Sequence, residues 1–116
     1  MIAVKRAYEP PAAEDGLRVL VERLWPRGLS KQRARIDLWL KEVAPTTELR
    51  KWYGHDPARW EEFRRRYLVE LSGKQDLVRT LKEKASQGTV TLVYSAREQH
   101  LNNAVALKMF LEGDAG

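Results

Sequence analysis

The chain has 116 residues, of which 43% are hydrophobic and 32% are charged, and its formal net charge at pH 7 is +5. This length and composition predict a single domain over residues 1–116 and exclude intrinsic disorder for most of the chain. The absence of cysteine excludes disulfides, thiolate nucleophiles and thiolate metal sites, and no metal centre is predicted. The early charged residues do not fit a signal peptide, and no apolar run approaches the ~20 residues of a membrane helix. We therefore expect a cytoplasmic protein.

The positive charge is concentrated in residues 18–35. This segment holds six basic residues and one acidic residue, Glu22, and accounts for the whole net charge. Five of the six basic residues are arginines, whose planar guanidinium matches a carboxylate or a phosphate. The pattern favours an anionic partner. A solvated basic loop, balanced by acidic residues elsewhere in the fold, is the competing interpretation.

Two strands are predicted near the amino terminus, at residues 2–6 and 17–23, because both segments are apolar or alternate with period two. The connection at 9–16 contains two prolines and a glycine, which predicts a loop or one helical turn. So short a connection leaves the relative direction of the two strands open. After a turn, Ser30 is expected to cap a short helix. Residues 36–40 then alternate as in a third strand, with a helix as the alternative.

The middle of the chain predicts three helices. The first is capped by a threonine and ends at Gly54. The second begins with Asp56 as N-cap and Pro57 as first helical residue and ends at Gly73, and the third covers residues 75–87. In the second helix the apolar side chains that recur every three or four residues predict a stripe facing the core. These side chains are Trp60, Phe63, Tyr67 and Leu71.

Residues 90–94 predict a buried central strand, because the segment is apolar and rich in β-branched residues. A final helix is expected to begin at Ser95 and to end at Gly113. Strands that alternate with helices favour a parallel sheet. The predicted fold class is therefore α/β: a single compact domain of three layers, with helices on both faces of a small, mostly parallel sheet.

Ligands of open parallel sheets bind beyond the carboxyl ends of the strands. The loops that follow residues 17–23 and 90–94 are therefore expected to face one crevice that binds an anionic small molecule bearing a phosphate or a carboxylate. The candidate ligand-binding residues are Arg23, Trp25, Arg27, Ser95, Arg97, Asn102 and Asn103.

Several of these residues have a structural alternative. Arg27 can bind the ligand, as we expect, or pair with an internal acid such as Asp37 or Glu22. The helix amino end after Ser95 can bind an anion, but Ser95 and Glu98 also fit a capping box that satisfies the N–H groups of that helix.

His55 is the candidate catalytic residue. An imidazole suits proton transfer near neutral pH, and Asp56 is placed to orient it. The alternative is a solvated histidine at the junction of two helices. The sequence assigns no reaction and no cofactor, so whether the chain is an enzyme stays open.

Two specific blocks stand within a longer pattern over nearly the whole chain: Arg-Leu-Trp-Pro-Arg-Gly at 23–28 and Gly-His-Asp-Pro at 54–57. Together they resemble the YeaO-like branch of the domain-of-unknown-function 488 family of uncharacterised prokaryotic proteins. The resemblance implies a compact α/β domain and no established activity. It also implies that more distant relatives carry Cys and His after the last strand. This chain has other residues there, so thiol chemistry does not carry over: Gln99, His100, Asn102 and Asn103.

The leading hypothesis is thus a domain that binds an anionic small molecule, with or without catalysis. A nucleic-acid-binding or regulatory module that uses the basic segment 18–35 is one alternative. We expect such binding to be weak, because arginines around Trp-Pro-Gly resemble a pocket more than a surface that follows phosphates. A partner-binding domain without chemistry is the other alternative. No membrane partner is expected, and the protein is expected to be a monomer or a homodimer.

Overall fold

The computed structural model describes residues 1–113 as a four-stranded sheet with several helices packed on it. The strands are β1 (Ile2–Arg6), β2 (Leu17–Leu20), β3 (Leu38–Trp39) and β4 (Val90–Tyr94), in the order β1-β4-β2-β3. All neighbouring strands are parallel, which answers the open question of direction. The predicted central strand is confirmed, since β4 pairs with β1 on one side and with β2 on the other.

The helices are α1 (Lys31–Ala34), α2 (Thr47–Tyr53), α3 (Trp60–Ser72), α4 (Gln75–Gln87) and α5 (Asn103–Leu111), with 3-10 turns at Ala13–Asp15, Lys41–Val43 and Pro57–Arg59. The predicted caps are confirmed. Ser30 accepts a hydrogen bond from the Arg33 N–H, Thr46 accepts one from the Leu49 N–H, and Asp56 accepts one from the Ala58 N–H. No helix in residues 1–113 is long and apolar enough to cross a membrane.

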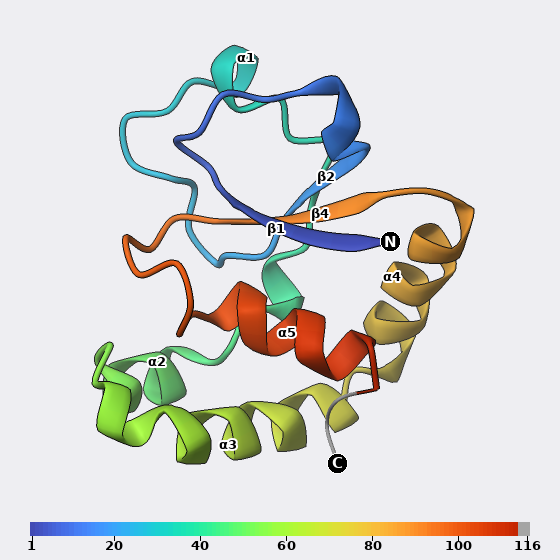
Figure 1. Ribbon diagram of the computed structural model, residues 1–116. Helices are drawn as coiled ribbons and strands as arrows, with labels where there is room; N and C mark the ends of the chain where they lie inside the picture. Colours follow the sequence, from blue (N-terminus) through green and yellow to red (C-terminus); the bar gives the residue numbers. More distant parts are fainter. Residues whose placement is uncertain (114–116) are drawn as a thin grey trace.

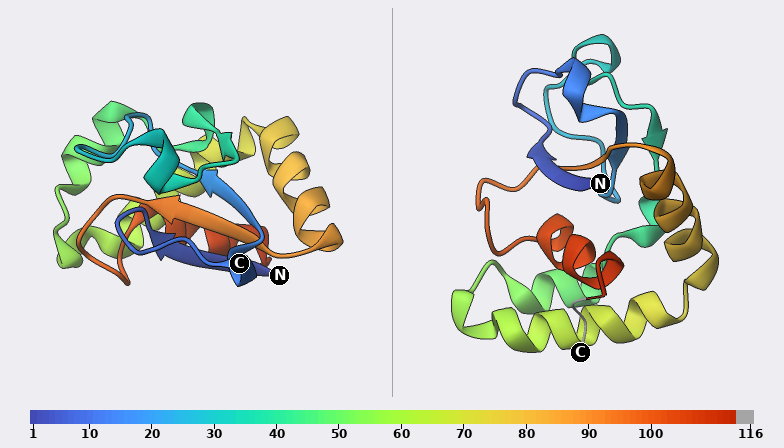
Figure 2. Two further views of the ribbon diagram at one scale, coloured as in Figure 1. Left: turned by 90° about the horizontal axis from the view of Figure 1, so that it is seen from above. Right: turned by 45° about the vertical axis from the view of Figure 1, so that its right-hand side comes forward.

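One face of the sheet carries the main core. Helix α5 packs against β1 and β4, α4 contacts β4, and α3 lies on the far side of α5 from the sheet (Figures 1 and 2). The predicted stripe of α3 is confirmed, because Phe63, Tyr67 and Leu71 are buried in this core and Trp60 is half-buried against it.

The opposite face is covered mainly by an irregular segment, residues 24–36. It contains only the four-residue helix α1, so the second helical layer is thinner than predicted. Trp25 and Trp39 meet edge to face with ring centroids 5.5 Å apart, and they pack against a small cluster on the sheet that includes Leu20 and Val93. The α/β fold class is confirmed, and the two faces are built differently.

A buried ion cluster connects this segment to the sheet. Arg18, which is only 3% exposed, donates to the Asp15 carboxylate at 2.7 Å and to the carbonyl of Ala34. Lys5 Nζ lies 3.1 Å from the same carboxylate. Next to it, Gly16 has a φ of +62°, and a Cβ there would lie 2.2 Å from the carbonyl oxygen of Thr89. Although Arg18 belongs to the basic segment 18–35, its guanidinium is bound within the fold by Asp15 and by the carbonyl of Ala34.

Two predicted boundaries are wrong. The second strand ends at Leu20 and does not reach residue 23, since the Glu22 carbonyl accepts from the Trp39 indole N–H at 2.6 Å and not from a backbone N–H of a neighbouring strand. The last helix begins at Asn103, with Asn102 as its N-cap, and does not begin at Ser95. The Ser95 N–H and hydroxyl are both bound by Glu22, so the predicted capping box does not form there.

Candidate functional site

A cavity of about 360 Å³ lies beyond the carboxyl ends of β2 and β4. In Figure 1 this is the side of the sheet where the loop after β4 descends towards α2. Residues from both strand ends, from α2 and the turn after it, from α3 and from the start of α5 line the cavity. They are Glu22, Thr47, Arg50, Lys51, Tyr53, His55, Phe63, Ser95, Ala96, Asn102 and Asn103.

Glu22 is the most deeply buried charged group of the cavity, with 5% of the residue exposed. One carboxylate oxygen, Oε2, accepts from the Ser95 N–H at 3.0 Å and from the Ser95 hydroxyl at 3.2 Å. A carboxylate oxygen offers about two lone-pair sites, so these two donors occupy Oε2. This contact also fixes the start of the loop that follows β4.

Aromatic rings form a wall of the cavity. Tyr53 and Phe63 stack with centroids 4.3 Å apart, and the Tyr53 hydroxyl donates to the carbonyl of Leu101 at 2.7 Å. Burial raises the pKa of the Tyr53 hydroxyl, and the nearby carboxylates of Glu98 and Asp56 raise it further. The hydroxyl is therefore a fixed, protonated donor that holds the loop after β4 against α2.

Helix α2 supplies the cationic groups of the cavity. Thr47, Arg50 and Lys51 are spaced by three and four residues, which places them on one face of the helix. All three are exposed at the cavity. In the described part of the chain, neither Arg50 nor Lys51 has a carboxylate within 4.0 Å. The cavity is thus lined by a buried acid from the end of β2 and by exposed cations from α2.

Besides the contacts with Glu22 and Tyr53, side chains within residues 95–102 also hold this loop. The Glu98 carboxylate accepts from the N–H groups of His100 and Leu101, and these bonds lower the pKa of Glu98, as do the imidazoles of His100 and His55. Asn102 donates to the carbonyl of Glu98 and accepts from the Val105 N–H. The Asn102 side chain therefore joins the loop to the start of α5, and Asn102 also lines the cavity.

Of the predicted ligand-binding residues, Ser95, Asn102 and Asn103 line the cavity. The Asn103 side chain donates to the carbonyl of Val21 at 2.9 Å and so anchors the start of α5 beside the end of β2.

The predicted arginines do not meet in this cavity. Arg23 donates to the carbonyls of Pro45 and Ala44. Arg27 is exposed, its carbonyl accepts from the Tyr8 hydroxyl, and its guanidinium has no hydrogen-bond partner among residues 1–113. Arg97 is exposed on the loop after β4. Trp25 packs on the other face of the sheet and donates to the carbonyl of Leu29.

The internal partners suggested for Arg27 are also engaged elsewhere. Asp37 accepts from the Arg18 N–H at 2.8 Å, and Glu22 binds Ser95. Within residues 1–113 the Arg27 guanidinium therefore has no internal acid as a partner, and its predicted contact with a ligand stays a prediction.

His55 lies at the cavity, exposed, in the left-handed region with φ of 57°. Asp56 caps the next turn by accepting from the Ala58 N–H and lies 3.7 Å from Arg59 Nε, so its carboxylate is occupied by other partners. Within residues 1–113, no group of three or more His, Cys, Asp or Glu side chains is placed to hold a metal ion.

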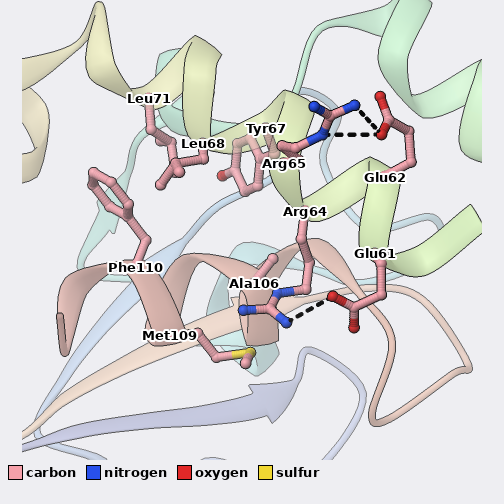
Figure 3. Close-up of a pocket in the computed structure, with 10 residues that line it drawn as sticks. All are labelled: Glu61, Glu62, Arg64, Arg65, Tyr67, Leu68, Leu71, Ala106, Met109 and Phe110. Carbon is pink, nitrogen blue, oxygen red and sulfur yellow. Dashed lines mark hydrogen bonds and ion pairs between the residues drawn. The ribbon is translucent and has the colours of Figure 1, made fainter. Parts of the chain in front are cut away.

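A second cavity, of about 430 Å³, lies between α3 and α5 and away from the strand ends (Figure 3). Its apolar side includes Leu68, Met109 and Phe110. Its charged side is neutralised internally, because Arg64 pairs with Glu61 and Arg65 with Glu62 (Figure 3). This cavity therefore offers no free cation to an anionic ligand.

Sequence reasoning missed Arg50 and Lys51, and it assigned Glu22 only as an internal partner. A signal for the two cations was present, since they lie one helical turn before His55, in the helix that ends at Gly54. The place of Glu22 at the cavity could not be predicted, because its contact with Ser95 joins two segments that are distant in the sequence.

The family described as "Inactive DUF488-N3 subclade" matches residues 1–115 of the chain. The chain belongs to this DUF488 subclade. The uncharacterized protein YeaO of Escherichia coli K12 is 40% identical over 110 residues, which is 95% of this chain and 96% of YeaO. The uncharacterized protein Rv3073c of Mycobacterium tuberculosis H37Rv is 40% identical over 112 residues, 97% of this chain and 94% of the relative. The resemblance to YeaO-like DUF488 proteins is confirmed. No solved structure matches the chain significantly.

Proposed function

We propose that this DUF488 protein binds a small anionic molecule, bearing a phosphate or a carboxylate, in the cavity beyond β2 and β4. The observation that carries the proposal is the pair of cations on α2. Arg50 and Lys51 face a cavity and lack a carboxylate partner within 4.0 Å among residues 1–113. Ligand pockets typically begin at ~300 Å³, so the cavity has the size of a small-molecule site.

Binding without catalysis is the form of this function that we favour. The subclade is described as inactive, and the chain has no cysteine to act as a nucleophile. His55 then serves as a third polar contact at the cavity edge, next to the Tyr53 ring at a centroid distance of 6.0 Å. This role needs no orienting carboxylate, which agrees with the engagement of Asp56 by other partners.

The test is calorimetric titration with two simple anions, propyl phosphate and pentanoate. The double variant Arg50→Gln/Lys51→Gln should bind them at least about tenfold more weakly than the unchanged protein, because it removes both charges that face the anion. The loss should shrink at high salt, since both side chains are exposed and screened.

The matched control is Arg79→Gln/Lys82→Gln. These two cations lie exposed on α4 and do not line the cavity, and the variant has the same change in net charge. It should bind the anions like the unchanged protein. Equal losses in the two double variants, or no binding of any phosphate or carboxylate probe to the unchanged protein, would count against the proposal.

A nucleic-acid-binding function is the second candidate, and one observation favours it. Four basic residues of the segment 18–35 are exposed, and none of them has a carboxylate within 4.0 Å in the described residues. These residues are Arg27, Lys31, Arg33 and Arg35. The other two are used by the fold, since Arg18 binds Asp15 and Arg23 binds backbone carbonyls.

A further inference from the structure

Glu22 gives the cavity a feature that a site for a plain anion does not need. A carboxylate inside an anion site repels the ligand, and burial makes its charge costly unless a donor compensates it. In the described part of the chain no Lys, Arg or His nitrogen lies within 4.0 Å of Glu22. Arg23, its neighbour in sequence, is directed to the carbonyls of Pro45 and Ala44 instead.

The second oxygen of Glu22 is the available one. Ser95 occupies Oε2 with two donors, and no hydrogen bond within residues 1–113 reaches Oε1. No side-chain oxygen or nitrogen of the described residues is both buried and without a partner, so Oε1 is accessible to solvent. Glu22 lines the cavity, and Oε1 is its carboxylate oxygen that has no partner among residues 1–113.

We propose that the ligand of this cavity is a zwitterion, in which a primary ammonium donates to Glu22 Oε1 and a phosphate or carboxylate faces Arg50 and Lys51. The inference rests on the proposed anion site and adds the class of its ligand. An ammonium supplies both a donor and the countercharge, and a hydrogen bond between two charged groups is roughly twice as strong as a neutral one. The aliphatic part of the ligand lies against the stacked rings of Tyr53 and Phe63.

Probe pairs that differ only in the ammonium test this directly. Aminoethyl phosphate is compared with propyl phosphate, aminopropyl phosphate with butyl phosphate, and γ-aminobutyrate with pentanoate. In each pair a methyl group replaces the ammonium, so size and anion are kept. The unchanged protein should bind at least one amine at least about tenfold more tightly than its partner. The phosphate and carboxylate pairs distinguish the two kinds of anion. This comparison needs no variant.

Glu22→Gln supplies the second readout, a reversal of preference. The amide still accepts from Ser95 but carries no charge, so the amine should lose affinity by about tenfold or more. The plain anion should bind equally well or better, because the repelling carboxylate is gone. Glu70→Gln is the matched control. Glu70 also accepts from an N–H and a hydroxyl of one residue, Thr46, and it does not line the cavity.

The outcomes separate the two proposals. Binding of plain anions that depends on Arg50 and Lys51, without any preference for the amines, overturns the zwitterion and leaves the anion site. The same holds if hydroxyethyl phosphate binds as tightly as aminoethyl phosphate, which would indicate a neutral donor. If none of the probes binds, both proposals are overturned. An equal loss of amine and plain anion in Glu22→Gln would show that Glu22 only supports the loop after β4.

Discussion

Two buried carboxylates of this protein differ in how completely they are compensated. Asp15 has the Lys5 ammonium, the Arg18 guanidinium and the Ala12 N–H around it. Among residues 1–113, the Glu22 carboxylate has only the two donors of Ser95. A fully paired buried acid serves the fold, whereas a partly paired acid at a cavity is available to a ligand.

Asp15→Asn should destabilise the fold by about 3–5 kcal/mol at neutral pH, because it leaves the buried Arg18 without its counterion. Burial by itself raises the pKa of Asp15, but the Ala12 N–H and the Lys5 and Arg18 cations outweigh burial and lower it below 3.8. Because the pKa of Asp15 is lower in the folded than in the unfolded protein, its carboxylate stabilises the fold at pH values above the pKa of the unfolded state. This stabilisation is lost as the pH falls through the pKa of the folded state. The difference between the variant and the unchanged protein should therefore shrink below pH 3.8.

Urea unfolding at several pH values measures this difference. Asp76→Asn is the control, since the Asp76 side chain is 98% exposed and its nearest cation, Arg79, lies 3.7 Å away. It should change the free energy of unfolding by less than ~0.5 kcal/mol. A constant penalty for Asp15→Asn from neutral to acidic pH would show that its charge is not what stabilises the fold.

At the scale of elements, local signals predicted α2, α3 and α4 well. Short-range chemistry sets both ends of α2, namely the Thr46 cap and the left-handed Gly54, and Asp56 caps the 3-10 turn that leads into α3. The loop of residues 95–102 was mispredicted as helix because its conformation depends on distant partners. Glu22 holds Ser95, and Tyr53 holds the carbonyl of Leu101. The cavity could not be predicted from local sequence patterns for the same reason, since these long-range contacts form it.

Helix α3 provides a test of the core. Phe63→Ala should destabilise the protein by roughly 3–5 kcal/mol, because the ring is 2% exposed and stacks on Tyr53 at 4.3 Å. Chemical unfolding gives the free energy directly. Val69→Ala on the same helix is the control, since Val69 is exposed, and its effect should stay within ~0.5 kcal/mol. Equal midpoints for Phe63→Ala and the unchanged protein would refute the assignment of this face.

At the scale of the whole molecule, charge is divided among three uses. Arg18 and Arg23 make internal contacts, and Arg50 and Lys51 face the cavity. The other four basic residues of the segment 18–35 are exposed: Arg27, Lys31, Arg33 and Arg35. The sequence showed the excess of +5 but not this division, because only the fold determines which guanidinium groups meet a backbone carbonyl. These four exposed cations are few and belong to a largely irregular segment, which limits how many phosphates they can contact at once.

The salt dependence of DNA binding distinguishes weak contacts made by these four exposed cations from specific nucleic-acid recognition. Each phosphate contact makes log K fall by about 0.9 per unit of log salt. We expect weak binding to a DNA duplex that does not depend on the DNA sequence. This binding should disappear near ~0.15 M salt, because few of the exposed cations reach the phosphate backbone of the DNA at once. Arg33→Gln/Arg35→Gln should reduce the salt slope by about 2, whereas Arg79→Gln/Lys82→Gln on α4 should leave it nearly unchanged. Fluorescence anisotropy at several salt concentrations measures both. Tight binding to one defined DNA or RNA sequence at ~0.15 M salt would instead establish nucleic-acid recognition and displace the small-molecule site as the main function.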